Sequence, residues 1–239
     1  MQIKVYKLIV GLLFLSHLTV AQNFYKDIIP RVNNLYIGVG PSFMYADNGG
    51  GLRNSQFKIR PATTIAYGRK INSFLELKGS FGYQMLESQD PGYYNDEVLR
   101  RWIEAGQAVG MKGNGYYFDL MPAFNLPVER HIDRKNVNIY AGIGLGVMLV
   151  RKEEVKIINN VPTVEKKTLS LAYIPIRGGI SYRIGPHSDL ALEGTMMATF
   201  SDEIDGNVGF NRFNDHLFQG QIVFKRYLSP FPFWNKYLN

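Results

Sequence analysis

The sequence predicts an all-β protein: an eight-stranded antiparallel up-and-down transmembrane β-barrel with short periplasmic turns and long extracellular loops. Three observations predict this fold. The chain opens with a secretory signal peptide, eight later segments alternate apolar and polar residues, and the connections alternate between short and long. We therefore expect a signal peptide over residues 1–21, a barrel over 22–228, and a periplasmic tail rich in aromatic residues and proline over 229–239.

The first 21 residues have the three parts of a signal peptide. Lys4 and Lys7 form a basic start, residues 8–20 form an apolar stretch, and Ala21 completes a small-residue cleavage site. The apolar stretch is shorter than the roughly 20 residues of a membrane-spanning helix. The alternative, an uncleaved anchor, fits this length less well. We therefore expect an exported protein whose mature chain begins near Gln22.

The composition excludes several classes of function. The formal charge is +7, but no basic run is interleaved with aromatic residues, so we expect no binding of nucleic acid. The absence of cysteine excludes disulfides and thiolate chemistry. After the signal peptide no apolar run reaches the length of a spanning helix. The 15 tyrosines, 15 phenylalanines and 24 glycines suit a barrel with aromatic girdles and a crowded interior.

Eight alternating segments give the predicted strands in order. The third is the clearest, because Leu75, Leu77 and Phe81 alternate with polar residues such as Glu76 and Lys78. A soluble β-sandwich would alternate in the same way. Several segments, however, have 11 residues or more, which is longer than usual soluble strands and sufficient for a tilted bilayer crossing. The segments are 35–45, 58–67, 75–85, 116–125, 137–149, 173–183, 189–200 and 218–225.

The connections between these segments also support a membrane barrel. Outer-membrane barrels have short periplasmic turns and long outer loops, and an even number of strands then places both termini in the periplasm. In the second long loop Asn95 is a good helix N-cap and Asp96 and Glu97 suit a first turn, which predicts a short helix over 95–105. The long loops are 46–57, 87–113, 151–167 and 201–214, and the shorter turns are 70–73, 128–136 and 185–188.

Charged residues deep within the strands lie on the polar face, so we expect them to point into the lumen. An arginine or lysine that faced lipid at mid-depth would cost ~2–4 kcal/mol. Eight strands enclose an interior just wide enough for side chains, so we expect these charges to pair and fill the lumen; gating of a narrow channel is the alternative. The predicted lumen ion-pair network consists of Arg60, Glu76, Lys78, Arg177, Glu193 and Lys225.

The sequence predicts neither a catalytic site nor a cofactor or metal site. His216 lies close in sequence to Asp215, Asp202 and Ser201, which together could form a Ser-His-Asp set that acts on lipid. Proximity along the chain does not give triad geometry, and a polar loop rim is the simpler interpretation. The acidic loop 201–207 lacks the alternating ligand spacing of a calcium loop. We therefore expect a non-enzymatic protein.

Several short motifs resemble one known family. They are Tyr36-Ile-Gly-Val-Gly40, Arg60-Pro61, Tyr67-Gly68, Ile71-Asn72, Ile174-Pro175-x-x-Gly178-Gly179-Ile180-x-Tyr182, and Glu193 leading to Phe200-Ser-Asp-Glu-Ile-Asp205. On these motifs the chain, from about residue 35 to 228, resembles the PorG-like small outer-membrane barrels of Bacteroidetes, which belong to the type IX secretion system. It departs from that family at Ala46-Asp47-Asn48, where Gly-Asp-Leu is usual.

The resemblance implies a non-enzymatic subunit of a protein secretion machine. Such a subunit would sit among outer-membrane lipids and anchor periplasmic lipoprotein-ring subunits to that membrane. The expected contact surface is the periplasmic end, made of 22–34, 128–136, 185–188 and 229–239; the aromatic residues of the tail could instead lie in the inner-leaflet interface of the membrane. The side chains singled out for contact are Arg130, His131, Asp133, Arg134, Lys135, Phe231, Phe233, Trp234 and Tyr237. Two alternatives stay open: a stand-alone barrel of the OmpA or OmpX kind for envelope integrity or surface binding, and a lipid-modifying enzyme centred on His216.

Overall fold

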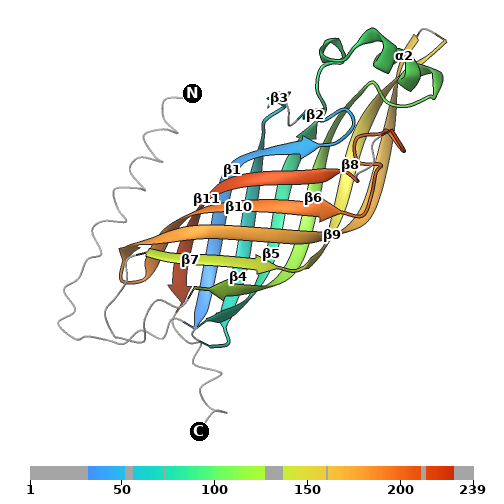
Figure 1. Cartoon of the computed structure of the whole chain (residues 1–239). Helices are drawn as coiled ribbons and strands as arrows, with labels where there is room; N and C mark the ends of the chain where they lie inside the picture. The colour runs from blue at the N-terminus through green and yellow to red at the C-terminus, as the bar shows by residue number, and fades with distance from the viewer. Residues whose placement is uncertain are drawn as a thin grey trace, which may run out of the picture.

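The computed structural model describes residues 32–51, 56–72, 74–126, 137–159, 161–210 and 214–228. Most of these residues lie in antiparallel strands that wrap into a barrel (Figure 1). The predicted signal peptide, the 128–136 turn and the 229–239 tail lie outside the described residues. Within the described ranges no helix is long and apolar enough to cross a membrane.

The barrel wall is one closed ring. β7 and β8 lie end to end between β6 and β9, so the ring has eight strand positions, and it closes because β1 pairs with both β4 and β11. This confirms the predicted eight-stranded antiparallel barrel. The wall strands are β1 (Asn33–Tyr45), β4 (Arg60–Lys70), β5 (Leu75–Glu87), β6 (Gly110–Asn125), β7 (Val137–Ile143), β8 (Leu145–Ile158), β9 (Val161–Gly185), β10 (Ser188–Thr199) and β11 (His216–Leu228).

The fifth predicted strand, 137–149, is interrupted at Gly144, which separates β7 from β8. A β-carbon at Gly144 would lie only 2.3 Å from the backbone oxygen of Leu120. The backbone of the neighbouring strand β6 therefore approaches so closely that only glycine fits at this position. The N–H of Gly144 donates to the backbone oxygen of Pro175 over 3.0 Å, which keeps β9 joined to the wall across the interruption.

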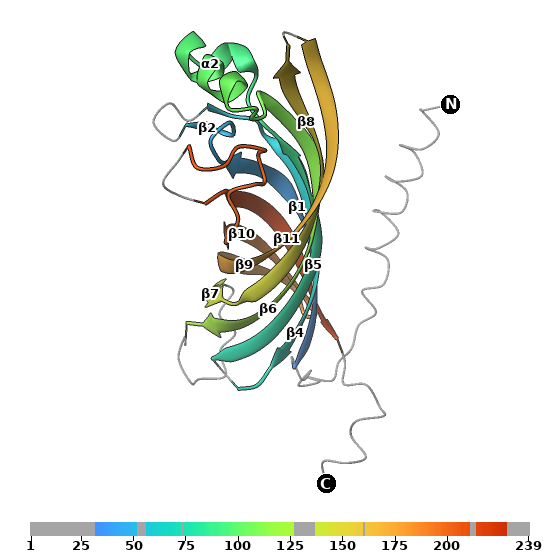
Figure 2. The same ribbon diagram turned by 90° about the vertical axis from the view of Figure 1, so that its right-hand side faces the viewer.

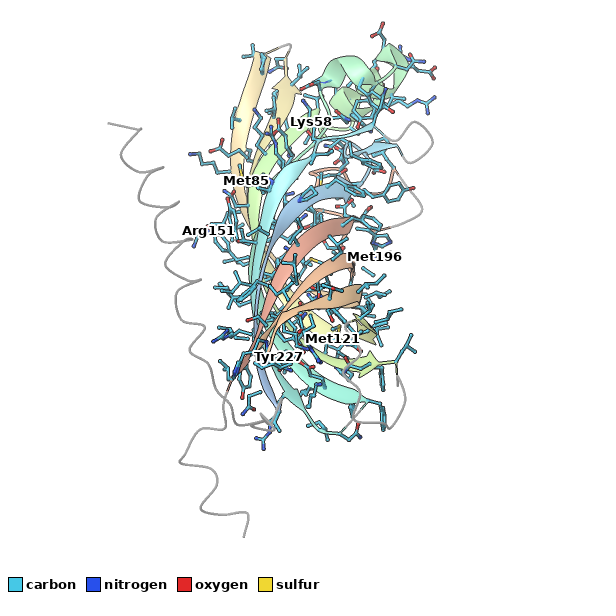
Figure 3. The ribbon with its side chains drawn as sticks, turned by 90° about the vertical axis from the view of Figure 1, so that its left-hand side faces the viewer. Lys58, Met85, Met121, Arg151, Met196 and Tyr227 are labelled. Carbon is cyan, nitrogen blue, oxygen red and sulfur yellow. The ribbon has the colours of Figure 1, made fainter. Side chains whose placement is uncertain are left out.

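The strands alternate between an apolar outer surface and a filled interior. In β1, Ile37 and Val39 are 47% and 54% exposed, whereas Tyr36, on the opposite face of the strand, is buried. The same alternation runs through β4, β5, β10 and β11. Figure 3 shows side chains on both surfaces of the wall. An exposed apolar surface over a polar interior is the pattern of a barrel that faces lipid.

The two ends of the barrel differ. We call the end with the turns at 71–74 and 186–187 the short-turn end, and the opposite end the long-loop end. Above the long-loop end lie a 3-10 turn (Pro91–Tyr93), the helix α2 (Asp96–Glu104) and a small hairpin of β2 (Gly50–Gly51) and β3 (Gln56–Phe57) (Figures 1 and 2). The helix confirms the prediction for 95–105, because the Asn95 side chain accepts a hydrogen bond from the backbone N–H of Glu97.

The prediction of a long loop over 151–167 is wrong. β8 continues to Ile158 and β9 begins at Val161, so this region is a hairpin in which Val155 pairs with Val164 and Glu153 with Lys166. The reason is that charged residues occupy both faces of the hairpin, so the apolar alternation that marks the wall strands disappears while the strand pairing continues. β6 likewise begins at Gly110, six residues before the predicted start at 116.

Candidate functional site

A network of four buried charges lies in the lumen. The Lys78 ammonium is 2.7 Å from the Glu193 carboxylate. The Arg177 guanidinium is 3.3 Å from Glu193 and 3.1 Å from Asp119. All four side chains are at most 2% exposed, and their formal charges sum to zero. Because they come from β5, β6, β9 and β10, the network ties together strands on different sides of the barrel.

Hydroxyl groups complete this network. Tyr140 donates to Glu193 over 2.7 Å, and Tyr173 donates to Asp119 over 2.9 Å. Arg177 also donates to the hydroxyls of Thr195 and Ser80, over 3.0 and 2.8 Å. Buried charges are tolerated only when they are paired and hydrogen-bonded, and these contacts meet that condition.

A second charged group lies towards the short-turn end. Lys225 is 3.7 Å from Glu76, and Glu76 also accepts hydrogen bonds from Asn34 and Tyr36. The Tyr36 ring links the two groups, since its centroid lies 4.4 Å from the Lys78 ammonium and 5.0 Å from that of Lys225. Cation–π contacts of this kind strengthen where water is excluded. Charges and tyrosines together therefore fill and stabilise the lumen towards the short-turn end.

The structure thus brings together five of the six residues predicted for the lumen network, and it places Arg60 elsewhere. Arg60 pairs with Glu87 at the long-loop end and keeps 37% of its side chain exposed. Arg60 is the first residue of β4, so it stands at the rim rather than at mid-depth. Asp119 belongs to the network but was missed; its place on the polar face of the fourth predicted strand was the signal that could have found it.

The other half of the lumen is mostly apolar. Towards the long-loop end lies a cluster without charges, in which the Tyr117 and Tyr173 rings meet edge to face with centroids 6.4 Å apart. Polar groups are also buried there, namely Gln84 and Gln219 beside Tyr117 and the Lys152–Glu154 pair beside Glu203. Methionine suits such irregular space because its side chain is unbranched and adaptable. The larger members are Met44, Leu86, Met111, Met148, Val150, Met197, Ile204 and Leu217, all at most 3% exposed.

The loops at the long-loop end form a cap over this apolar cluster, fastened by two buried aspartates. Asp205 accepts hydrogen bonds from the backbone N–H groups of Asn48 and Asn207, over 3.0 and 2.8 Å. Asp215 accepts from the backbone N–H groups of Ile204 and Asp205, over 2.7 and 3.2 Å. The loop after β1 and the loop between β10 and β11 are therefore held together by carboxylate-to-backbone bonds.

Burial changes the titration of both aspartates. Burial away from solvent raises the pKa of Asp205 to about 7, and the nearby Asp47 carboxylate raises this pKa further. Loss of water raises the pKa of Asp215 to about 9, with a further contribution from Asp205. Burial disfavours the charged form of a carboxyl group, and a second carboxyl close by disfavours it further. The cap therefore holds two acids whose pKa values lie well above the ordinary value of an aspartate, about 7 for Asp205 and about 9 for Asp215.

The long-loop end does not assemble the Ser-His-Asp set considered from sequence. His216 Nδ1 lies 3.1 Å from the backbone oxygen of Asp215, not from its carboxylate. The Asp215 carboxylate is occupied by backbone N–H groups, and the Ser201 hydroxyl accepts from the backbone N–H of Glu203. Among the described residues no three acidic or histidine side chains are placed to hold a metal ion.

The side chains singled out for contact with a periplasmic partner lie outside the described residues. This applies to Arg130, His131, Asp133, Arg134 and Lys135 in the 128–136 turn, and to Phe231, Phe233, Trp234 and Tyr237 in the tail. Their partner role stays a prediction.

Comparison with solved structures finds the same architecture. Neisserial surface protein A aligns over 82% of this chain and 97% of its own, with 11% sequence identity and a TM-score of 0.50. The chain has the fold of a small outer-membrane β-barrel. A major outer membrane protein from Thermus thermophilus aligns over 81% of this chain and 99% of its own, with 13% identity and a TM-score of 0.46.

A third structure is Ail, the attachment invasion locus protein of Yersinia pestis, which aligns over 82% of this chain and 96% of its own, with 14% identity and a TM-score of 0.43. No protein-family model and no curated protein sequence matches the chain.

Proposed function

We propose that this protein is a non-enzymatic barrel of a bacterial outer membrane, with both termini in the periplasm, that presents its long-loop end for surface binding. The observation that carries the proposal is the filled lumen. Paired charges around Arg177 and Glu193 occupy one half, and the apolar cluster around Met197 occupies the other. A barrel filled in this way serves as an anchor for its ends rather than as a pore.

The cap supports the second part of the proposal. A loop that only connects strands has little need for buried hydrogen bonds, yet Asp205 and Asp215 fasten the cap through backbone contacts. In addition Trp102 of α2 is 3% exposed and its ring lies 4.8 Å from that of Tyr94. Ordered loops on a rigid barrel are where binding surfaces commonly occur.

The filled lumen is tested by conductance in planar bilayers or by solute entry into liposomes that contain the purified protein. We expect no conductance above that of protein-free membranes. A matched variant, Arg177→Ala with Glu193→Ala, removes charged side chains from mid-depth and is expected to introduce measurable conductance. Steady conductance of the wild-type protein would contradict the proposal.

The orientation is tested with single-cysteine variants, which need no other change because the chain contains no cysteine. Arg100→Cys lies on α2 at the long-loop end, and Ile71→Cys lies at the short-turn end, where Ile71 is 60% exposed. A maleimide that cannot cross membranes should label the first variant in intact cells and the second only after lysis. The reverse pattern would contradict the proposed orientation.

A second candidate is the subunit of the type IX secretion machine that the family resemblance implies, which anchors periplasmic lipoprotein-ring subunits to the outer membrane. Its support is the resemblance, together with the concentration of charge in 128–136 and of aromatic residues in 229–239. The test is mild crosslinking in cells and purification of the mature protein. Recovery of ring lipoproteins, lost on deletion of 229–239, would support this role, whereas recovery of the barrel alone with normal secretion in a deletion strain would reject it.

A further inference from the structure

The hairpin of β8 and β9 extends beyond the rest of the wall at the long-loop end (Figures 1 and 2). β9 has 25 residues, but its pairing with β10 ends where Tyr173 faces Thr199. β8 is covered further along, because β6 pairs with it as far as Val155. From Val161 to Leu171, therefore, β9 has a strand partner on one side only within the described part of the chain.

The direction of the backbone groups on this edge follows from two contacts. The carbonyl of Ala172 accepts from Phe200 on the β10 side, and the carbonyl of Pro175 accepts from Gly144 on the other side. Since successive residues of an antiparallel strand point their N–H and C=O groups to opposite edges, even-numbered residues face the free edge. The residues that offer both groups to the free edge are Val164, Lys166, Thr168 and Ser170.

The edge is open to solvent. All residues from 161 to 168 are exposed, with Val161 at 60% and Val164 at 58%. A row of unpaired backbone groups is a template for one more strand, and proteins bind extended segments in this way. Most charged side chains of the hairpin pair with one another, as Lys166 does with Glu153 and Lys156 with Glu165.

The charge of the hairpin selects among possible partners. Five basic and three acidic residues between 151 and 167 leave a formal charge of +2. Arg151, which faces Thr168 across the hairpin and projects from the outer surface (Figure 3), makes no ion pair with any described residue. A second copy would bring its own Lys166 and Lys167 against the same residues, and edge lysines of this kind oppose self-pairing. An acidic segment is attracted instead.

We propose that the free edge of β9, from Val161 to Leu171, is a docking site for an extended acidic segment of another protein, which adds to the hairpin as a further strand. The inference rests on the proposed surface role, because the hairpin must face outward to meet a partner. The conductance and labelling experiments do not involve this edge, so failure of the surface role and failure of the docking site are distinguishable.

The test uses the purified full-length barrel in nanodiscs and, as probe, a synthetic peptide of alternating threonine and glutamate. We expect the peptide to bind and to slow amide hydrogen exchange at Val164, Lys166, Thr168 and Ser170. Thr168→Pro removes one N–H on the free edge without touching the pairing with β8, and proline is tolerated on such edges. This variant should weaken binding at least tenfold, whereas the matched control Thr168→Val should bind as the wild type does.

Three results would overturn the proposal. The first is absence of peptide binding, or equal binding to Thr168→Pro. The second is binding that persists when lysine replaces glutamate in the peptide. The third is slow hydrogen exchange at these amides in the protein without peptide. Slow exchange that depends on protein concentration would mean that a second copy covers the edge. Slow exchange that does not depend on concentration would mean that another segment of this chain covers it.

Discussion

Towards the short-turn end the lumen is filled mainly by charges and tyrosines, whereas towards the long-loop end it is filled mainly by methionines and other apolar side chains. In the charged half, Arg177 and its partners gain stability only as a complete set, because one missing member leaves another charge buried and unpaired. In the apolar half, each contact around Met197 contributes separately by burial and packing. The comparison teaches that two chemistries close one barrel, and that they should respond differently to single and paired substitutions.

The largest effect is expected for Arg177→Met, which leaves the buried Asp119 and one side of Glu193 without their cation. Removal of one partner of a buried ion pair costs about 3–5 kcal/mol. The measurement is the free energy of unfolding by urea in detergent micelles. Adding Asp119→Asn to Arg177→Met should recover more than half of the loss, since Glu193 keeps Lys78. If the two substitutions destabilise additively, the charges do not act as a set.

A loss of unfolding free energy is also expected for Met197→Ala in the apolar half, but no second substitution should recover it. Truncation of a buried methionine leaves a cavity and costs about 2–5 kcal/mol, and Met197 is fully buried. The same urea titration gives the value. The control Met197→Leu conserves volume and should cost less than about 1.5 kcal/mol. A neutral Met197→Ala would mean that this half is loosely packed.

The cap should be less stable at high pH. The folded cap raises the pKa of Asp205 to about 7 and of Asp215 to about 9, so it favours the protonated acids. This contribution is complete below the ordinary pKa of an aspartate, about 3.9, and is lost as pH rises through the two folded values. Each group can change the free energy of cap opening by at most about 1.4 kcal/mol per pH unit.

Trp102 fluorescence reports cap opening once Trp234→Phe leaves Trp102 as the only tryptophan. Emission should shift towards that of exposed tryptophan between pH 6 and pH 10. Asp215→Asn keeps a carbonyl oxygen for the N–H groups of Ile204 and Asp205 but cannot ionise, so the upper part of the shift should disappear. An unchanged pH profile in Asp215→Asn would show that this acid does not control the cap.

The smallest effect is expected for Asn95→Ala on the outer surface of the cap. Loss of an N-cap costs a helix about 1 kcal/mol, and Asn95 accepts from the N–H of Glu97. Amide exchange in α2 should become about fivefold faster with no change in the unfolding of the barrel, while Asn95→Ser should behave as the wild type does. A change in barrel unfolding would mean that α2 supports the wall and not only the cap.

The sequence predicted the ring of strands and most of the lumen ion-pair network because both follow from period-two alternation. Leu77 and Lys78 occupy opposite faces of β5 whatever their neighbours are. Period-two alternation predicts which face of a strand a side chain lies on. It does not predict how deep in the barrel that side chain lies, because the depth depends on the stagger between neighbouring strands. For this reason Arg60 was placed in the network although it stands at the rim, and Asp119, which meets Arg177 from another strand, was missed.

The hairpin of β8 and β9 could not be predicted for a different reason. Where a strand pair leaves the membrane, neither of its faces needs apolar residues, so the signal that marks the other strands ends at about residue 150. What holds the hairpin is pairing between strands, as between Glu153 and Lys166. The cap is similar, since the hydrogen bond that the backbone N–H of Asn48 donates to the Asp205 carboxylate joins residues 157 positions apart in the sequence.

The uninterrupted course of β9 has a mechanical consequence. Its 25 residues run from the tip of the hairpin to the turn at the opposite end of the barrel, and they are hydrogen-bonded to β7, β8 and β10 along the way. Ladder hydrogen bonds lie across the strand direction, so a pull on the hairpin tip along the strand loads many of them in shear at the same time. Tension at the tip is thereby distributed over the whole height of the wall instead of peeling one bond after another.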